Sequence, residues 1–122
     1  MNTKVLRVAI APREAIIRYT RDVVAGRHRR AAGDPDVWFT SIESFAKVLS
    51  ESNRALLAMI ALRRPDSIDA LAAASGRAKS NLSRTLRTME RYGLVRLERG
   101  AGRKVKPSVT FARVELRLNV AA

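Results

Sequence analysis

The segment from Lys79 to Tyr92 constrains the fold more than any other part of the chain. Its apolar positions Leu82, Leu86 and Met89 are spaced as one stripe along a helix that packs on one side. Gly93 follows directly and can end the helix at its C-terminal cap. The other positions are mostly polar or cationic. We therefore expect a surface helix with one buried stripe and one charged face.

A short helix and a hairpin are expected on either side of this helix. Ser67 can cap a short helix that ends at Gly76, only a few residues before the next helix begins. On the other side, residues 94–97 suggest a strand, residues 99–102 a turn and residues 103–106 a returning strand. Two helices joined by a tight turn, with a hairpin after the second, form a winged helix-turn-helix.

The rest of the chain supplies further helices and a strand at each end. The expected elements are a strand at 4–10, a helix at 12–25, a loop at 27–36, helices at 42–49 and 53–62, and a strand at 113–120. The closing strand is expected beside residues 4–10. The length of 122 residues fits one compact domain.

The expected fold class is α+β, mainly α, a winged helix-turn-helix with an extra N-terminal strand and helix. We divide the chain into two regions. Residues 1–36 form an N-terminal strand, helix and basic loop for dimerisation or partner binding. Residues 37–122 are expected to form the winged helix-turn-helix, a kind of domain that commonly binds DNA, with the C-terminal strand.

The net charge of +13 is concentrated in two segments. Residues 77–106 carry ten Lys and Arg against two acids, and residues 1–33 carry eight against two, whereas residues 34–76 lean acidic. Clustered cations favour a polyanionic partner, because neutralising phosphates releases counterions. Nucleic acid is therefore the expected partner. The basic run from Arg27 to Arg30 is interpreted either as a solvated loop or as a phosphate-binding arm.

The charged face of the helix at 79–92 predicts which residues would contact double-stranded DNA. At about 100° per residue, Ser80, Arg84, Arg87 and Arg91 lie opposite the apolar stripe. For base readout we expect Lys79, Ser80, Asn81, Ser83 and Arg84, with Arg84 suited to guanine and Asn81 to adenine. For phosphate or wing contacts we expect Arg77, Arg87, Arg91, Arg99, Arg103 and Lys104.

Enzymatic and membrane functions are not expected. The chain has no cysteine and one histidine, His28, so no metal site, cofactor or catalytic triad is predicted. Its carboxylates have ordinary roles as helix caps or ion partners. No apolar run approaches the roughly 18 residues of a membrane span, and the N-terminus lacks a secretory signal, so a cytoplasmic location is expected.

Residues 75–86, SGRAKSNLSRTL, together with residues 91–95, RYGLV, resemble the MarR-type winged-helix regulators. With residues 37–39, 44–50 and 53–54 included, the chain is similar to a narrower prokaryotic group of transcriptional regulators that includes TumA-type antitoxins. The resemblance implies a homodimer that represses its own operon, with a small toxin protein as a partner in the antitoxin case. One departure is Ala78, where such helices often have a Ser cap, a loss of about 1 kcal/mol.

Three alternatives stay open. A MarR-like regulator that senses a small molecule could use Trp38, Phe39 and Phe45 as a pocket, although core packing also explains them. An RNA-binding winged helix is disfavoured by the aromatic content of 5%, because RNA readers commonly stack bases on aromatic rings. The third is an interaction protein that binds a partner polypeptide through the N-terminal strand and helix.

Overall fold

The computed structural model describes residues 4–120, which fold into two compact units. Within these residues, unit 1 comprises 4–47 and 111–120, and unit 2 comprises 48–110. The fold class is α+β, as expected, with five helices and two small sheets between residues 4 and 120. None of those helices has the length and apolar character that a membrane crossing requires.

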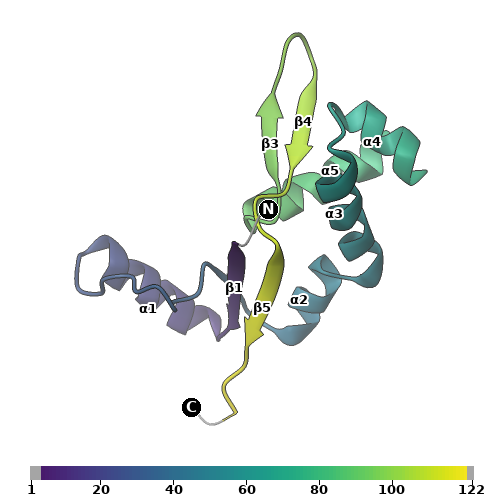
Figure 1. Cartoon of the computed structure of the whole chain (residues 1–122). Helices are drawn as coiled ribbons and strands as arrows, with labels where there is room; N and C mark the ends of the chain where they lie inside the picture. Colours follow the sequence, from purple (N-terminus) through teal and green to yellow (C-terminus); the bar gives the residue numbers. More distant parts are fainter. Residues whose placement is uncertain (1–3, 121–122) are drawn as a thin grey trace. The chain divides into compact units, whose positions relative to one another are not determined.

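Unit 1 is built on a small parallel sheet (Figure 1). Its elements are β1 (Val5–Ile10), α1 (Arg13–Val24), β2 (Val37–Phe39), α2 (Ile42–Val48) and β5 (Arg113–Arg117). The strand order is β2-β1-β5, and β1 pairs in parallel with both neighbours. Parallel neighbours need a long crossover, and all of unit 2 lies in the connection between β1 and β5 along the chain.

The two helices of unit 1 cover opposite faces of this sheet. Trp38 and Phe39 are consecutive in β2, so their side chains point to opposite sides. The Trp38 ring lies 5.3 Å from the Tyr19 ring of α1, and the Phe39 ring lies 5.4 Å from the Phe45 ring of α2, edge to face. These contacts are those of core packing, the simpler of the two interpretations of Trp38, Phe39 and Phe45.

Unit 2 consists of three helices and a hairpin. Its elements are α3 (Glu51–Arg63), α4 (Ile68–Ser75), α5 (Lys79–Arg91), β3 (Arg96–Arg99) and β4 (Val105–Ser108). The core residues are contributed by all three helices and the segment after α5: Leu56, Leu57, Ile60, Leu71, Leu82, Leu86, Met89, Leu94 and Val95.

The ends of the helices in unit 2 follow from single residues. The Ser67 hydroxyl accepts a hydrogen bond of 3.0 Å from the Ala70 N–H and caps α4 as expected. Arg64 adopts a left-handed conformation (φ 48°) and ends α3, because Pro65 excludes the α region for the residue before it. The expected helices are thus confirmed to within two residues at each end.

Unit 1 differs from the sequence expectations at three points. The expected division after residue 36 differs from the observed units, because β5 returns to β1 and brings residues 111–120 into unit 1. The strand β2 was not expected, since three residues are too few for a visible alternation. The closing strand ends at Arg117 instead of residue 120, where its pairing with Ala9 of β1 also ends.

The hairpin is displaced by two residues from its expected position. Gly93 and Leu94 donate N–H hydrogen bonds of 3.0 and 2.9 Å to the carbonyls of Glu90 and Met89, a Schellman cap that holds Leu94 in the core. The strand therefore begins at Arg96 and not at residue 94. The returning strand is 105–108 instead of 103–106, because the N–H of Gly100 bonds to the Lys104 carbonyl across a longer loop.

Candidate nucleic-acid interface

The turn between α4 and α5 is short and fixed by a glycine. Gly76 has a φ of 73°, which residues with a side chain rarely adopt, and its N–H donates to the Ala72 carbonyl at 2.9 Å. Only Arg77 and Ala78 separate it from the first residue of α5. Ala78 is the N-cap and makes no side-chain cap bond, as expected for an alanine at a position where similar helices often have a serine. The first amides of α5 therefore have no side-chain cap.

Helix α5 has the two faces that its sequence predicts. Leu82, Leu86 and Met89 are buried. The residues expected on the opposite face, Ser80, Arg84, Arg87 and Arg91, are all exposed, as are Lys79 and Asn81, while Ser83 is half-buried. One buried stripe thus holds the helix against unit 2 and leaves a polar, cationic face in solvent.

The cations of this face differ in how far they are engaged by the protein itself. Within residues 4–120, the side chains of Arg84 and Arg87 make no ion pair or hydrogen bond. The Arg91 guanidinium donates to the Thr88 hydroxyl at 3.3 Å but keeps its charge uncompensated. Lys79 pairs with Asp69 at 2.7 Å, and since both side chains are well exposed this pair is weak. All four remain available to an anion.

Arg77 was expected to contact phosphate, but its side chain is hydrogen-bonded within the protein. Its guanidinium donates to Asn53 Oδ1 at 3.2 Å and to the carbonyl and hydroxyl oxygens of Ser52 at 3.0 and 2.7 Å. It thereby ties the turn between α4 and α5 to the first turn of α3. The sequence gives little signal for this link, because the partners lie 24 and 25 residues away along the chain.

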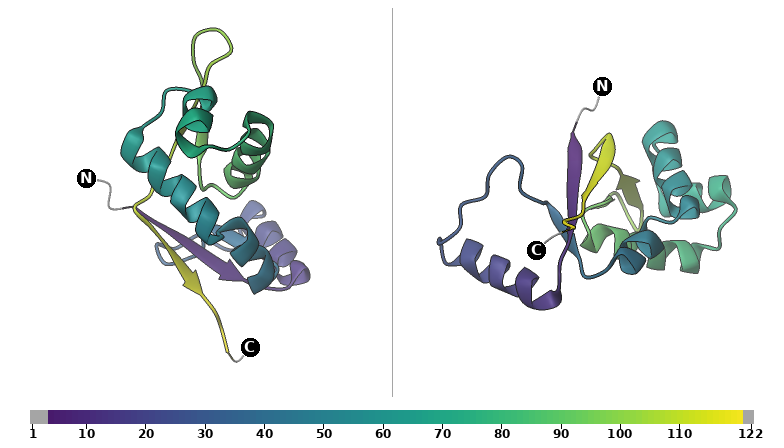
Figure 2. Two further views of the ribbon diagram at one scale, coloured as in Figure 1. Left: turned by 90° about the vertical axis from the view of Figure 1, so that its right-hand side faces the viewer. Right: turned by 90° about the horizontal axis from the view of Figure 1, so that it is seen from below.

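The hairpin carries a second group of exposed cations at its tip. Arg99, Arg103 and Lys104 are all exposed, and their side chains have no acidic partner within residues 4–120. Glu98, the acid of the hairpin, lies 3.7 Å from Arg96 and opposite Lys106, away from the tip. Gly102 takes a φ of 69° in the loop. The tip projects beyond the three helices of unit 2 (Figures 1 and 2).

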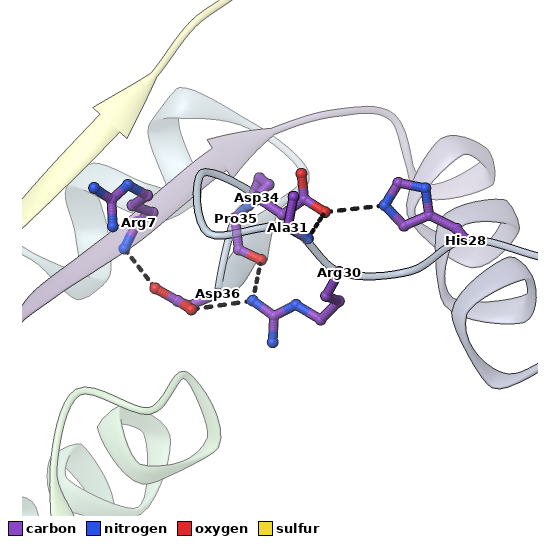
Figure 3. Close-up of polar contacts among 7 residues, drawn as sticks. All are labelled: Arg7, His28, Arg30, Ala31, Asp34, Pro35 and Asp36. Atoms are coloured by element: carbon purple, nitrogen blue, oxygen red, sulfur yellow. Dashed lines mark hydrogen bonds and ion pairs between the residues drawn. The ribbon is translucent and has the colours of Figure 1, made fainter. Parts of the chain in front are cut away.

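Three residues of the basic run after α1 have acidic partners in α1 or in the following loop, and Figure 3 shows the contacts of His28 and Arg30. Arg27 pairs with Asp22 at 3.1 Å, and His28 lies 3.0 Å from Asp34. Arg30 pairs with Asp36 at 3.0 Å and donates to the Pro35 carbonyl at 2.9 Å. The arginine pairs are exposed and therefore weak, and Arg29 has no acidic partner within residues 4–120, so the run keeps cationic groups available to solvent or to an anion.

The same contacts shift the ionisation of two groups in the loop. The hydrogen bond from the Ala31 N–H, followed by that from His28, lowers the pKa of the Asp34 carboxyl. The hydrogen bond to Asp36 raises the pKa of the Arg30 guanidinium. Asp36 also accepts the Arg7 N–H at 2.9 Å, so the loop is fastened to β1. The loop is thus held together by its own acids and by β1.

Comparison with known proteins gives one match. The family model HVO_A0114 matches residues 48–116, which is more than half of the chain and includes all of unit 2. No curated protein matches the chain, and no solved structure does.

Proposed function

The chain belongs to the HVO_A0114 family, and we propose that it is a sequence-specific repressor of transcription that binds double-stranded DNA. The observation that carries this proposal is the exposed face of α5, where Arg84 and Arg87 have no acidic partner within residues 4–120. In this interpretation unit 2 is a winged helix-turn-helix, with α4 and α5 as the helix pair and β3–β4 as the wing.

The first half of α5 would read bases. In helix-turn-helix proteins the N-terminal residues of the second helix approach base edges in the major groove. Asn81 and Arg84 are exposed there, and their side chains match the edges of adenine and guanine respectively. Lys79, Ser80 and the half-buried Ser83 flank them. The buried stripe on the other side of α5 would hold these side chains in position.

The wing and the second half of α5 would hold the DNA backbone. Arg87, Arg91, Arg99, Arg103 and Lys104 are exposed cations without an acidic partner within residues 4–120. Such side chains reach phosphates and position the protein without reading sequence. A hairpin tip can also enter an adjacent minor groove.

The biological role is proposed on the resemblance to MarR-type and TumA-type regulators. We expect a homodimer that binds a pseudo-palindromic operator and represses its own operon. Half-sites would be separated by about 10 bp or a multiple of that spacing. In the antitoxin version of this role, a neighbouring reading frame encodes a small toxin protein. A neighbouring transporter or catabolic enzyme would instead support a regulator that senses a ligand.

The proposal is tested by selecting duplexes from a random DNA library and measuring two variants on the selected site and on a scrambled site. Arg84→Ala should lose about 1–3 kcal/mol on the selected site and much less on the scrambled one. Arg103→Ala should weaken both about equally and reduce the slope of log K against log salt by about 0.9 for the lost phosphate contact.

The outcomes separate the alternatives. If no sequence is enriched, the protein is not a sequence-specific DNA binder. If Arg84→Ala weakens both duplexes equally while Arg103→Ala affects only the selected site, the hairpin reads bases and α5 holds the backbone. Tighter binding to RNA hairpins than to any duplex would favour the RNA-binding alternative. Repression is then tested with a reporter gene placed behind the selected site.

A further inference from the structure

Strand β5 is an edge of the sheet in unit 1, and its outer side has no partner within residues 4–120. Its neighbour is β1, on one side only. Val114 is half-buried, but Leu116 is 38% exposed, and after the strand Leu118 is 49% exposed and Val120 fully exposed. An edge of this kind is a template for pairing with another strand.

The alternation continues beyond the strand itself. Apolar residues at 114, 116, 118 and 120 alternate with charged or polar ones, yet β5 ends at Arg117 together with its pairing to β1. After Arg117 the chain runs away from the sheet (Figures 1 and 2). A cavity of about 570 Å³ opens beside this segment and is lined in part by Leu116, Arg117 and Leu118. The alternating pattern thus extends over more residues than the strand that a single copy of the chain forms.

We propose that β5 pairs with β5 of a second copy of this chain, antiparallel, about a two-fold axis at Leu116. This interface joins two three-stranded sheets into one continuous sheet. A two-fold contact is self-complementary, so each residue and its opposite number exchange roles in the two copies.

The charges and apolar residues of β5 complement each other in this register. Leu116 faces Leu116 of the second copy, and Val114 faces Leu118 of the second copy, on one side of the sheet. Glu115 faces Arg117 of the second copy on the other side, and the symmetry makes this ion pair twice. Opposite charges and apolar pairs directly across an antiparallel ladder stabilise it.

The neighbouring registers are less favourable. A slip of one residue would place Leu116 directly opposite Glu115 or Arg117 of the second copy, an apolar side chain against a charged one. An axis at Glu115 would place Glu115 against itself and Arg113 against Arg117 of the second copy, which are like charges. An axis at Val114 would pair Arg113 with Glu115, a contact that Arg113 already makes within the chain at 3.3 Å. It would also leave Leu118 and Val120 unpaired.

The register is tested with single cysteines, since the chain has none of its own. Leu116→Cys places two thiols directly opposite each other, within reach of a disulfide. Val114→Cys is the matched control, because its two copies would be about 13 Å apart along the ladder. Under mild oxidation Leu116→Cys should form a covalent species of twice 13.5 kDa about tenfold faster than Val114→Cys. A mixture of Val114→Cys and Leu118→Cys should crosslink like Leu116→Cys.

Charge exchange tests the same interface without a disulfide. Glu115→Arg and Arg117→Glu should each be monomeric by sedimentation equilibrium at a concentration where the unchanged protein is dimeric. Mixing the two variants should restore a dimer, because each arginine then faces a glutamate. A monomeric unchanged protein, or faster crosslinking of Val114→Cys than of Leu116→Cys, would overturn the proposal. These measurements contain no DNA, so they stand apart from any result on operator binding.

Discussion

Arg77 offers the sharpest test of how this structure separates stabilising cations from cations available to DNA. Its sequence position, two residues before α5, indicates a phosphate contact, whereas its hydrogen bonds to Ser52 and Asn53 indicate a link between helices. Replacing it with alanine removes all three bonds at once. The two interpretations then differ in which measured quantity changes.

The expected loss of stability follows from the environment of those bonds. A hydrogen bond from a charged donor contributes up to about 1.5–3 kcal/mol, and a neutral one about 0.5–1.5. The bond to Asn53 is part-buried, but the two bonds to Ser52 are exposed, so water replaces much of what they contribute. We therefore expect Arg77→Ala to reduce the free energy of unfolding of unit 2 by about 1–2 kcal/mol in total. The Asn53 amide keeps its bond to the Val48 carbonyl.

The assay combines urea unfolding with DNA binding across a salt series, and Arg54 and Arg87 are the controls. Both are exposed arginines on helices of unit 2, and their side chains have no ion pair or hydrogen bond within residues 4–120. Each should change stability by less than about 0.5 kcal/mol. Arg87→Ala should reduce the salt slope by about 0.9, whereas Arg77→Ala should leave it unchanged. If Arg77→Ala keeps full stability and lowers the slope like Arg87→Ala, the link to α3 is incidental and Arg77 contacts DNA.

Two further predictions concern a helix cap and a titrating loop. Ala78→Ser should raise the free energy of unfolding by about 0.5–2 kcal/mol in a urea titration, because a hydroxyl would cap the amides of α5 that Ala78 leaves uncapped; an unchanged or lower value would contradict the cap geometry. The pKa of Asp34 is lowered by Ala31 and His28, so the ionised carboxylate stabilises the loop above the usual Asp range and this contribution is lost as pH falls through the lowered value. The ¹³C carboxyl shift of Asp34 should titrate below that range, and titration within or above it would be inconsistent with these hydrogen bonds.

The elements that could be predicted from the sequence are those whose signals are local. The helix α5 has its apolar spacing and a glycine after it, and α4 has Ser67 and Gly76 at its ends. The strand β2 is too short to show a period. Alternation predicts strands at residues 4–10 and 113–120, of which 118–120 are not in the strand, and it carries no information on strand direction, so the parallel pairing of β1 and β5 emerges only in the structure.

The same distinction applies to the candidate interface. Which residues of α5 are exposed follows from 100° per residue, and the expected face is the exposed one. Whether an exposed cation is engaged depends on acids and amides elsewhere in the chain. The partners of Arg77 lie 24 and 25 residues away, and no periodicity reports such contacts.

A count of charge therefore overstates the free charge of the run from Arg27 to Arg30 and describes residues 77–106 well. In the run from Arg27 to Arg30, Asp22, Asp34 and Asp36 neutralise most of the cations, because the loop folds back on itself and on the end of α1. In residues 77–106 the two acids lie where they cannot neutralise the exposed cations of α5 and the hairpin tip: Glu98 is opposite Lys106, and Glu90 makes no ion pair within residues 4–120. Affinity for a polyanion comes from the release of counterions. A cation that is paired with an acid of the protein must first leave that acid, so it contributes less to this affinity. The uncompensated cations Arg84, Arg87, Arg99, Arg103 and Lys104 are for that reason the residues whose replacement should change DNA affinity, and replacing the paired Arg27 or Arg30 should change it much less.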